Sequence, residues 1–166
     1  MDFNGLCLPA GGDFVKRVLV RCEDLFGPWI GSKLGFEWFS GRGQIIGLMD
    51  ERQGPVAAAL FEGCNGASIS VHLASAHRQW LNREFLWFVC YYPFEQLKVH
   101  KVIAPIESSN SDSIRWTEHF GFTLEATLKD AAPKGDLLIY TITRDQCKWL
   151  ALKDRNSEQT KSPRSS

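Results

Sequence analysis

The chain has 166 residues, of which 44% are hydrophobic, so it is long and apolar enough for one domain with a continuous core. Its 19 basic and 19 acidic residues balance, which argues against nucleic acid or an anionic membrane as a partner. The five cysteines are scattered, without a CxxC pair or a Cys/His cluster. This usage indicates a reducing compartment and no metal site.

The N-terminus has no basic start followed by an apolar run, so we expect no secretory signal. The longest apolar stretch, residues 85–94, is too short to cross a membrane and contains Pro93. A soluble, cytoplasmic protein is therefore expected.

The first part of the chain is predicted to hold one helix and one aromatic loop. Residues 1–12 are weakly patterned and are expected to be loose. Asp13 can cap a helix over residues 14–26, whose apolar residues recur at helical spacing. A Gly-Pro pair then breaks the pattern. Residues 27–43 carry several aromatic side chains, and two interpretations stay open: a loop folded onto the core, or the wall of a substrate site.

Three strand-like runs follow, over residues 44–49, 56–61 and 68–73. They are separated by turn-forming residues, and Asn65 and Gly66 in the second turn suit positive backbone angles. The three strands are therefore expected to pair in an antiparallel meander.

Residues 82–97 form a predicted helix that is apolar on nearly all sides, so it should be largely buried. A strand is predicted after it, at residues 101–106. A strand-helix-strand connection of this length implies a parallel pair with the strand at 68–73. The result is an α/β (α+β) fold with a mixed, mostly antiparallel central sheet and helices on both faces.

The segment 110–140 is the most informative part of the chain. Asp112 or Ser111 can cap a helix, and Gly121 can end it. A new strand follows, and a Gly-Asp turn leads into another strand at residues 137–142. Beyond it, the polar sequence from residue 151 to 166 predicts a disordered tail, which leaves residues 13–150 as a single domain.

This order of strand, Asn-opened helix, Gly-Phe and hairpin resembles the C-terminal half of the GNAT superfamily of acyl-CoA N-acyltransferases. The resemblance covers roughly the last two-thirds of the chain and implies the GNAT fold. Within the superfamily, the chain looks most like the ribosomal-protein alanine acetyltransferases and the GNAT-like proteins of tailed bacteriophages. The residues that carry this likeness are Asn110, Ser113, Gly121, Phe122, Glu125 and Leu128, followed by Asp145, Cys147 and Trp149.

The resemblance implies acetyl-CoA as a cosubstrate, bound by a loop that precedes the helix at 82–97. Glycines allow the backbone of that loop to approach the pyrophosphate in the family. This chain has SAHRQWLNREF there, so Arg78 and Arg83 would supply charge in place of close backbone contact. The alternative is that both arginines are solvated charges at the start of a helix.

The resemblance also implies that the strands at 68–73 and 101–106 splay apart, and that the exposed edge of the first binds the pantetheine arm. A backbone N–H of Leu73 or Ala74 would then face the thioester oxygen. Asn110 would contact the coenzyme A arm, although it could also simply start a helix. Many members have a tyrosine, the acid for the leaving thiolate, at the position that corresponds to Thr117.

Two residues are candidate catalytic bases. His72 lies in the strand at 68–73, and an imidazole titrates near neutrality, but a hydrogen-bonded structural histidine is the alternative. Glu107 follows the next strand, and a solvated turn carboxylate is its alternative. The remaining histidines have no metal-ligand spacing, and Cys90, among apolar neighbours, is interpreted as a small buried hydrophobe.

The sequence therefore favours an N-acetyltransferase that moves an acetyl group from acetyl-CoA to a primary amine, by direct attack in a ternary complex. The acceptor would be a protein N-terminus or a small amine. The alternative is a phage GNAT-like protein with a degenerate coenzyme site, acting as a virion component or a host-interaction module. Thr117 and the unusual loop favour that alternative, and a homo-oligomer or a virion assembly is compatible with the sequence.

Overall fold

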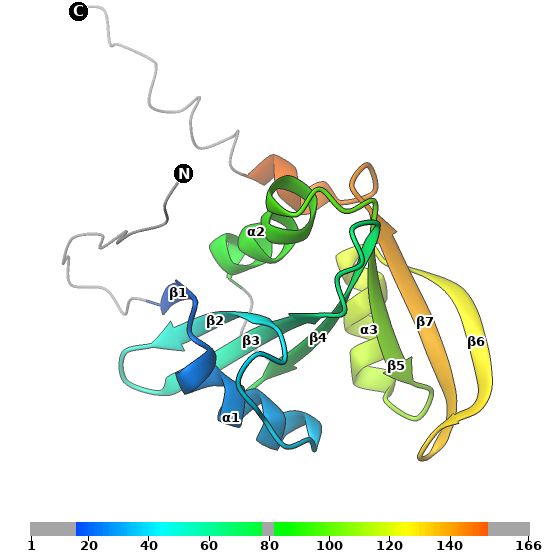
Figure 1. Cartoon of the computed structure of the whole chain (residues 1–166), viewed down its shortest axis with the longest axis horizontal. Coiled ribbons are helices and arrows are strands. Elements are labelled where there is room, and N and C mark those ends of the chain that lie inside the picture. The colour runs from blue at the N-terminus through cyan, green and yellow to red at the C-terminus, as the bar shows by residue number, and fades with distance from the viewer. Residues whose placement is uncertain (1–15, 78–81, 153–166) are drawn as a thin grey trace, which may run out of the picture.

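The structure is a computed structural model that describes residues 16–77 and 82–152 (Figure 1). The expected loose segment 1–12, Asp13 and most of the predicted tail lie outside these residues. The elements follow in the order β1 (Lys16–Val20), α1 (Glu23–Leu34), β2 (Gln44–Asp50), β3 (Gly54–Glu62), β4 (Ser68–Ser75), α2 (Arg83–Tyr91), the π-helical turn η1 (Tyr92–Gln96), β5 (Lys101–Glu107), α3 (Ser111–Phe120), β6 (Thr123–Ala132), β7 (Gly135–Thr143) and the 3-10 turn η2 (Lys148–Leu152).

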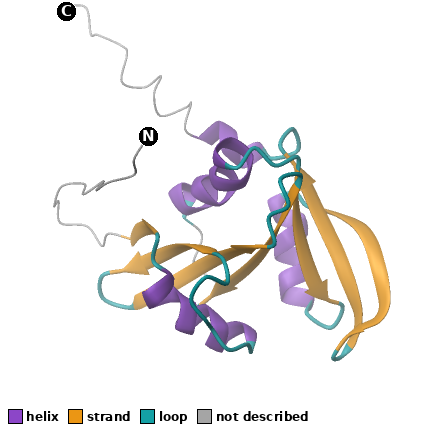
Figure 2. Ribbon diagram, viewed as in Figure 1, coloured by secondary structure: helices purple, strands orange, loops and turns teal. Residues whose placement is uncertain are grey.

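The strands form one seven-stranded sheet in the order β1-β2-β3-β4-β5-β7-β6 (Figure 2). Neighbouring strands are antiparallel except β4 and β5, which are parallel. The helical crossover through α2 explains the exception, because a chain that crosses over a sheet returns in the same direction. The predicted mixed, mostly antiparallel sheet is confirmed.

Helices cover both faces of the sheet, as predicted. Phe26 and Ile30 of α1 pack against strand residues on one face. Phe85 of α2 and Ile114 of α3 pack into a larger core on the opposite face. Figure 1 shows α1 and α2 on opposite sides of strands β2 to β4. Because successive side chains of a strand alternate between faces, the inner strands contribute to both cores.

The helix predicted over residues 14–26 is wrong for residues 16–22 and is confirmed only for residues 23–26. Lys16–Val20 forms β1, which pairs antiparallel with β2, and α1 begins only at Glu23. Arg21 lies between them with a φ of 55°, a left-handed conformation that a right-handed helix cannot contain. The apolar pattern of a run this short is compatible with a helix or a strand. Here the hydrogen-bonded pairing with β2 stabilises the strand.

The Gly-Pro pair that was expected to break a helix lies inside α1. Gly27 is required there because a Cβ atom would lie 2.2 Å from the Trp38 indole. Phe36 and Trp38 pack on the core under α1, which supports the interpretation of a segment folded onto the core. Leu34 lines the pocket described below, so the end of α1 also contributes a wall.

The antiparallel meander of β2, β3 and β4 is confirmed. In the turn before β4, Gly66 has the expected positive φ, 85°, whereas Asn65 does not. Asn65 instead stabilises the turn through its side-chain oxygen, which accepts hydrogen bonds from the backbone N–H groups of Ala67 and Ser68 at 2.9 and 2.8 Å. The helix predicted at 82–97 begins as α2 and ends in η1.

Candidate functional site

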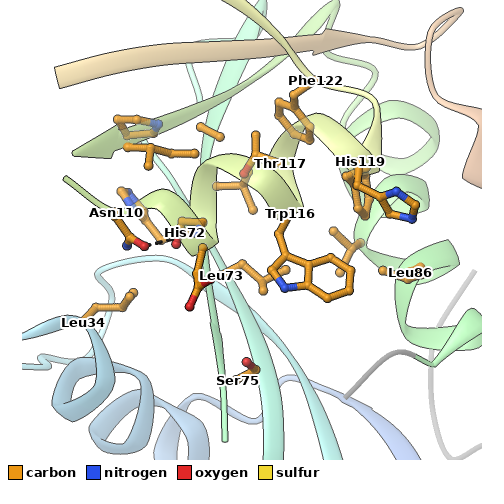
Figure 3. Close-up of a pocket in the computed structure, with 18 of the residues that line it drawn as sticks. Leu34, His72, Leu73, Ser75, Leu86, Asn110, Trp116, Thr117, His119 and Phe122 are labelled. Carbon is orange, nitrogen blue, oxygen red and sulfur yellow. Dashed lines mark hydrogen bonds between the residues drawn. The ribbon is translucent and has the colours of Figure 1, made fainter. Parts of the chain in front are cut away.

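Strands β4 and β5 separate soon after they begin. Their last paired residues are Ser70 and Ile103, although β4 continues to Ser75 and β5 to Glu107. The separation expected between these strands is therefore present. A pocket of about 420 Å³ lies at the opening (Figure 3), a volume typical of small-molecule sites.

The lining of this pocket comes from both faces of the sheet. Leu73 and Ile106 belong to the α2–α3 face, whose core they join. Side chains alternate along a strand, so His72 and Glu107 lie on the other face, which is the one that Leu34 of α1 occupies. A ligand in the opening would thus meet groups from both sides of the sheet.

The inner edge of β4 presents backbone groups to the pocket. The N–H of Ala76 donates to the Val56 carbonyl oxygen in β3 at 2.8 Å. Backbone groups of a strand alternate in direction, so the N–H of Ala74 also faces β3, whereas the N–H of Leu73 faces the separated β5. Leu73 lines the pocket, and Ala74 packs into the core under α1. The geometry favours Leu73 over Ala74 as a donor to a ligand.

Helix α3 forms one wall of the pocket, with Asn110, Trp116 and Thr117 lining it (Figure 3). The N-cap of α3 is Asn110, the residue that could also simply start a helix, whereas Ser111 and Asp112, predicted as caps, lie in the first turn of the helix. The Asn110 side-chain oxygen accepts a 3.1 Å hydrogen bond from a backbone N–H of the first turn. The cap uses the oxygen of Asn110 and leaves its amide nitrogen outside that bond.

His72 has a hydrogen-bonded partner. Its Nε2 lies 3.0 Å from Oε1 of Glu62, and the other oxygen of Glu62 accepts a 2.9 Å hydrogen bond from Nε of Arg42. Burial lowers the pKa of His72, and the attraction of Glu62 only partly opposes that effect. The imidazole is therefore neutral at neutral pH while it lines the pocket.

Glu107 lies at the end of β5 and also lines the pocket. Its Oε1 atom is buried and has no hydrogen-bond partner. Buried carboxylate oxygens are almost always satisfied by a donor, so this atom is available to a donor on a ligand. The residue as a whole is partly exposed, so Glu107 combines one buried oxygen with a position that solvent reaches.

Of the two predicted phosphate-binding arginines, only Arg83 belongs to the described part of the chain. Arg78 lies outside the described residues. Arg83 is the exposed first residue of α2 and does not line the pocket. At this helix start, Asn82 caps the N–H of Phe85 at 2.9 Å, and Glu84 adds a negative charge to the first turn.

Sequence reasoning missed Glu62 and Arg42 as partners of His72. A signal for Glu62 exists in the predicted hairpin, because its register pairs Glu62 with Ser70 and so makes Glu62 the diagonal neighbour of His72 on the same face. Arg42 precedes β2 and approaches Glu62 only once the sheet has formed, so no local pattern connects the two.

Cys90 and Cys147 are both buried. Burial raises the pKa of the Cys90 thiol, which makes it a poor nucleophile. Across residues 16–77 and 82–152, no group of three or more His, Cys, Asp or Glu side chains could hold a metal ion. In the same part of the chain, no helix has the length and apolar character needed to cross a membrane.

Three solved structures of spermidine N-acetyltransferases have a similar fold. A mutant form of the spermidine/spermine N-acetyltransferase SpeG from Vibrio cholerae matches with a TM-score of 0.62 and 14% identity, over 86% of this chain and 99% of its own. A chimera of the Vibrio cholerae enzyme and hSSAT matches with a TM-score of 0.62 and 16% identity, over 82% and 98% of the two chains. The Vibrio cholerae spermidine N-acetyltransferase in complex with CoA and spermine matches with a TM-score of 0.59 and 15% identity, over 82% and 98%.

Identities this low establish the fold alone. The chain has the GNAT fold, as the sequence predicted. No protein-family model and no curated protein matches the sequence.

Proposed function

We propose that the protein is an N-acetyltransferase that moves an acetyl group from acetyl-CoA to a primary amine, by direct attack in a ternary complex. The acceptor is a protein N-terminus or a small amine. The observation that carries this proposal is the separation of β4 from β5, which leaves the N–H of Leu73 facing a pocket lined from both faces of the sheet. A structure with the same fold contains CoA and spermine, which supports a coenzyme and an amine as the ligand pair.

The residues on the α2–α3 side fit an acyl-coenzyme A. The unpaired edge of β4 suits the amide groups of a pantetheine arm, and the Leu73 N–H would polarise the thioester carbonyl. Asn110 lines the same pocket and would donate its amide hydrogens to that arm. Asn82 already caps the start of α2, which leaves fewer of its backbone N–H groups available to an anion. Arg78 and Arg83 would therefore bind the phosphates with their side chains.

The residues on the α1 side fit the acceptor amine. His72 is neutral and can take a proton from the attacking nitrogen. The free buried oxygen of Glu107 can accept a hydrogen bond from the amine, so Glu107 serves as a second proton acceptor or as a guide for the ammonium form.

Titration with acetyl-CoA tests the proposal directly. A ligand present at about 100 times its dissociation constant stabilises a protein by roughly 2.7 kcal/mol, so we expect a clear rise in melting temperature. Mass spectrometry should then detect an acetylated product among small primary amines and peptides with free N-termini. Absence of any thermal shift at millimolar acetyl-CoA would overturn the proposal.

The second candidate is a phage GNAT-like protein with a degenerate coenzyme site, related to the ribosomal-protein alanine acetyltransferase branch and acting as a virion component or host-interaction module. The observation that favours it is Thr117, which lines the pocket without offering the phenol of a tyrosine. The similar structures reported above are Vibrio cholerae acetyltransferases and give it no support. Copurification with phage particles, as a virion assembly, would favour it; copurification of a second copy of the chain would indicate a homo-oligomer under either function.

A further inference from the structure

We propose that Glu62, held in position by Arg42, is a positioning residue that keeps the proton of His72 on Nε2 and leaves Nδ1 as the proton acceptor. This inference rests on the proposed function, because it assigns the pair to the proton transfer of the acetylation. It adds two residues to the site that do not line the pocket themselves.

The strand register brings His72 and Glu62 together, and Arg42, which precedes β2, reaches Glu62 from outside the strands. His72 of β4 is paired with Leu60 and Glu62 of β3 with Ser70, so Glu62 and His72 are diagonal neighbours on one face. Each oxygen of Glu62 has one partner: Oε1 lies 3.0 Å from Nε2 of His72, and Oε2 lies 2.9 Å from Nε of Arg42. All three side chains are between 23% and 28% exposed, so solvent screens these contacts only in part.

Arg42 is itself fixed in place. Its guanidinium carbon lies 3.8 Å from the centre of the Phe36 ring, a cation–π contact that restricts a long side chain. Phe36 in turn packs on the core under α1. The core therefore fixes Phe36, Phe36 restricts Arg42, and Arg42 holds the carboxylate of Glu62.

This arrangement determines which nitrogen of His72 can accept a proton. A carboxylate only accepts hydrogen bonds, so its partner Nε2 must carry a hydrogen. In a neutral imidazole, the other nitrogen, Nδ1, then has a free lone pair. Burial lowers the pKa of His72 and Arg42 lowers it further, while Glu62 raises it. The carboxylate thus orients the ring, and Arg42 limits the extent to which Glu62 favours the charged imidazolium.

Other charged groups near His72 are few among the described residues. Glu107 lies on the pocket wall formed by β5, and His77 and Asp112 line the same pocket. From α1, which packs on this face, Glu23 is bound to Gln44 and the backbone of Ile45. Lys33 of α1 lies over the Trp29 ring. Glu62 and Arg42 are the charged partners in hydrogen-bonded connection with the imidazole.

The amine nitrogen forms a C–N bond to the thioester carbonyl carbon, and the C–S bond breaks with its electron pair on sulfur. The proton of the attacking nitrogen moves to Nδ1 of His72, and the thiolate takes a proton from solvent. His72 then returns its proton to solvent, so the net products are the N-acetylated amine and coenzyme A.

Titration of His72 by NMR, with histidine labelled in ¹³C and ¹⁵N, tests the inference without any substrate. We expect Glu62→Gln to lower the His72 pKa and to increase the Nδ1–H tautomer. Arg42→Gln should raise the same pKa, because the positive charge that opposes protonation is removed. Arg17→Gln is the matched control: Arg17 of β1 pairs with Glu51, which follows β2, and both side chains are exposed, so the His72 titration should not move.

Activity gives a second, independent measurement. In Glu62→Gln, kcat should fall about 10- to 100-fold, with the acidic limb of the kcat profile at lower pH and KM for acetyl-CoA unchanged. In Arg42→Gln the same limb should move to higher pH. The melting temperatures of both variants are compared with that of the wild type to show that they fold. If Glu62→Gln does not fold, the shift of the His72 pKa in Arg42→Gln tests the inference.

The outcomes separate this inference from the proposed function. A His72 titration that neither variant moves overturns the positioning role, even if the wild type acetylates amines. Opposite shifts of the His72 pKa in a protein that never acetylates an amine would support the geometry of the three residues and overturn the proposed reaction. A uniform loss of kcat with no movement of the acidic limb would assign Glu62 a structural role only.

Discussion

The indole Nε1 of Trp149 donates a 2.7 Å hydrogen bond to the carbonyl oxygen of Phe120, the last residue of α3. The carbonyl groups at a helix C-terminus have no partners within the helix, so η2 supplies one from elsewhere in the chain. Lys148 adds a second contact, from its Nζ to the carbonyl oxygen of His119 at 3.2 Å. Because Trp149 also lines the pocket, η2 holds the far end of the wall that α3 provides.

Replacing Trp149 should separate this hydrogen bond from the packing of the ring. Trp149→Phe removes the donor and keeps an aromatic ring near Phe120, so we expect a loss of about 1 kcal/mol in the free energy of unfolding. Trp149→Ala should cost more, because the ring contact with Phe120, 5.4 Å between centroids, is lost as well. Urea unfolding followed by circular dichroism measures both. Equal losses would show that the ring contact adds nothing, and an unchanged stability of Trp149→Phe would show that the hydrogen bond contributes nothing.

Asn110 combines a helix cap with a proposed coenzyme contact, and two substitutions can separate these roles. Asp caps a helix as well as Asn does, so Asn110→Asp should change stability little, whereas Asn110→Ala should lose about 1 kcal/mol. Both remove the amide donor. Isothermal titration with acetyl-CoA should therefore show weaker binding for both, and unchanged affinity in Asn110→Asp would reject the coenzyme contact.

Gly47 is predicted to tolerate no side chain. A Cβ atom at this position would lie 2.5 Å from the ring of Phe26, which is fully buried between α1 and the sheet. We expect Gly47→Ala to lower the free energy of unfolding by about 1–3 kcal/mol.

A double-mutant cycle identifies the cause. Phe26→Leu makes room for the added methyl group, so the two substitutions together should cost less than the sum of their separate losses. Additive losses measured by denaturant unfolding would contradict the clash.

The buried phenol of Tyr140 should make stability fall at high pH. Burial and the 2.8 Å hydrogen bond to Glu118 raise the Tyr140 pKa from 10.0 to about 12. Between these two values the unfolded chain loses the proton and the native protein keeps it, so the free energy of unfolding decreases as the pH rises. Above about pH 12 the decrease from this group is complete.

Tyr140→Phe tests that dependence. The variant should lose about 1 kcal/mol at pH 7, because it lacks the hydrogen bond. Its stability should then fall less steeply than that of the wild type between pH 10 and 12. The difference between the two proteins in urea unfolding isolates Tyr140 from other alkaline titrations, and parallel curves would contradict the raised pKa.

Much of the fold was predictable because local chemistry determines it. The turn at Asn65 and Gly66, the glycine that ends α3 and the alternation of β2 to β4 are all visible in short windows of sequence. The N-terminal part was not predictable in this way. β1 is a strand because Val18 lies opposite Leu48 in β2, and α1 includes Gly27 because Trp38 occupies the space above it.

The candidate site was also predictable only in part. His72, Glu107, Leu73 and Asn110 were singled out from their positions in the predicted elements, and all four line the pocket. Arg42 was missed, because a residue outside the strands is brought to Glu62 by tertiary packing alone. Arg83 was singled out from its place before the helix, yet its side chain is exposed and away from the pocket.

The edge of β4 has a consequence for how such a site changes during evolution. The proposed donor at Leu73 is a peptide group, and every amino acid except proline supplies one. It is therefore inherited with the fold and not with any residue, which accords with a shared architecture at 14% identity. An alanine scan would detect only the packing of the leucine side chain. Chemical synthesis that exchanges the amide of residue 73 for an ester would delete the donor and leave every side chain in place.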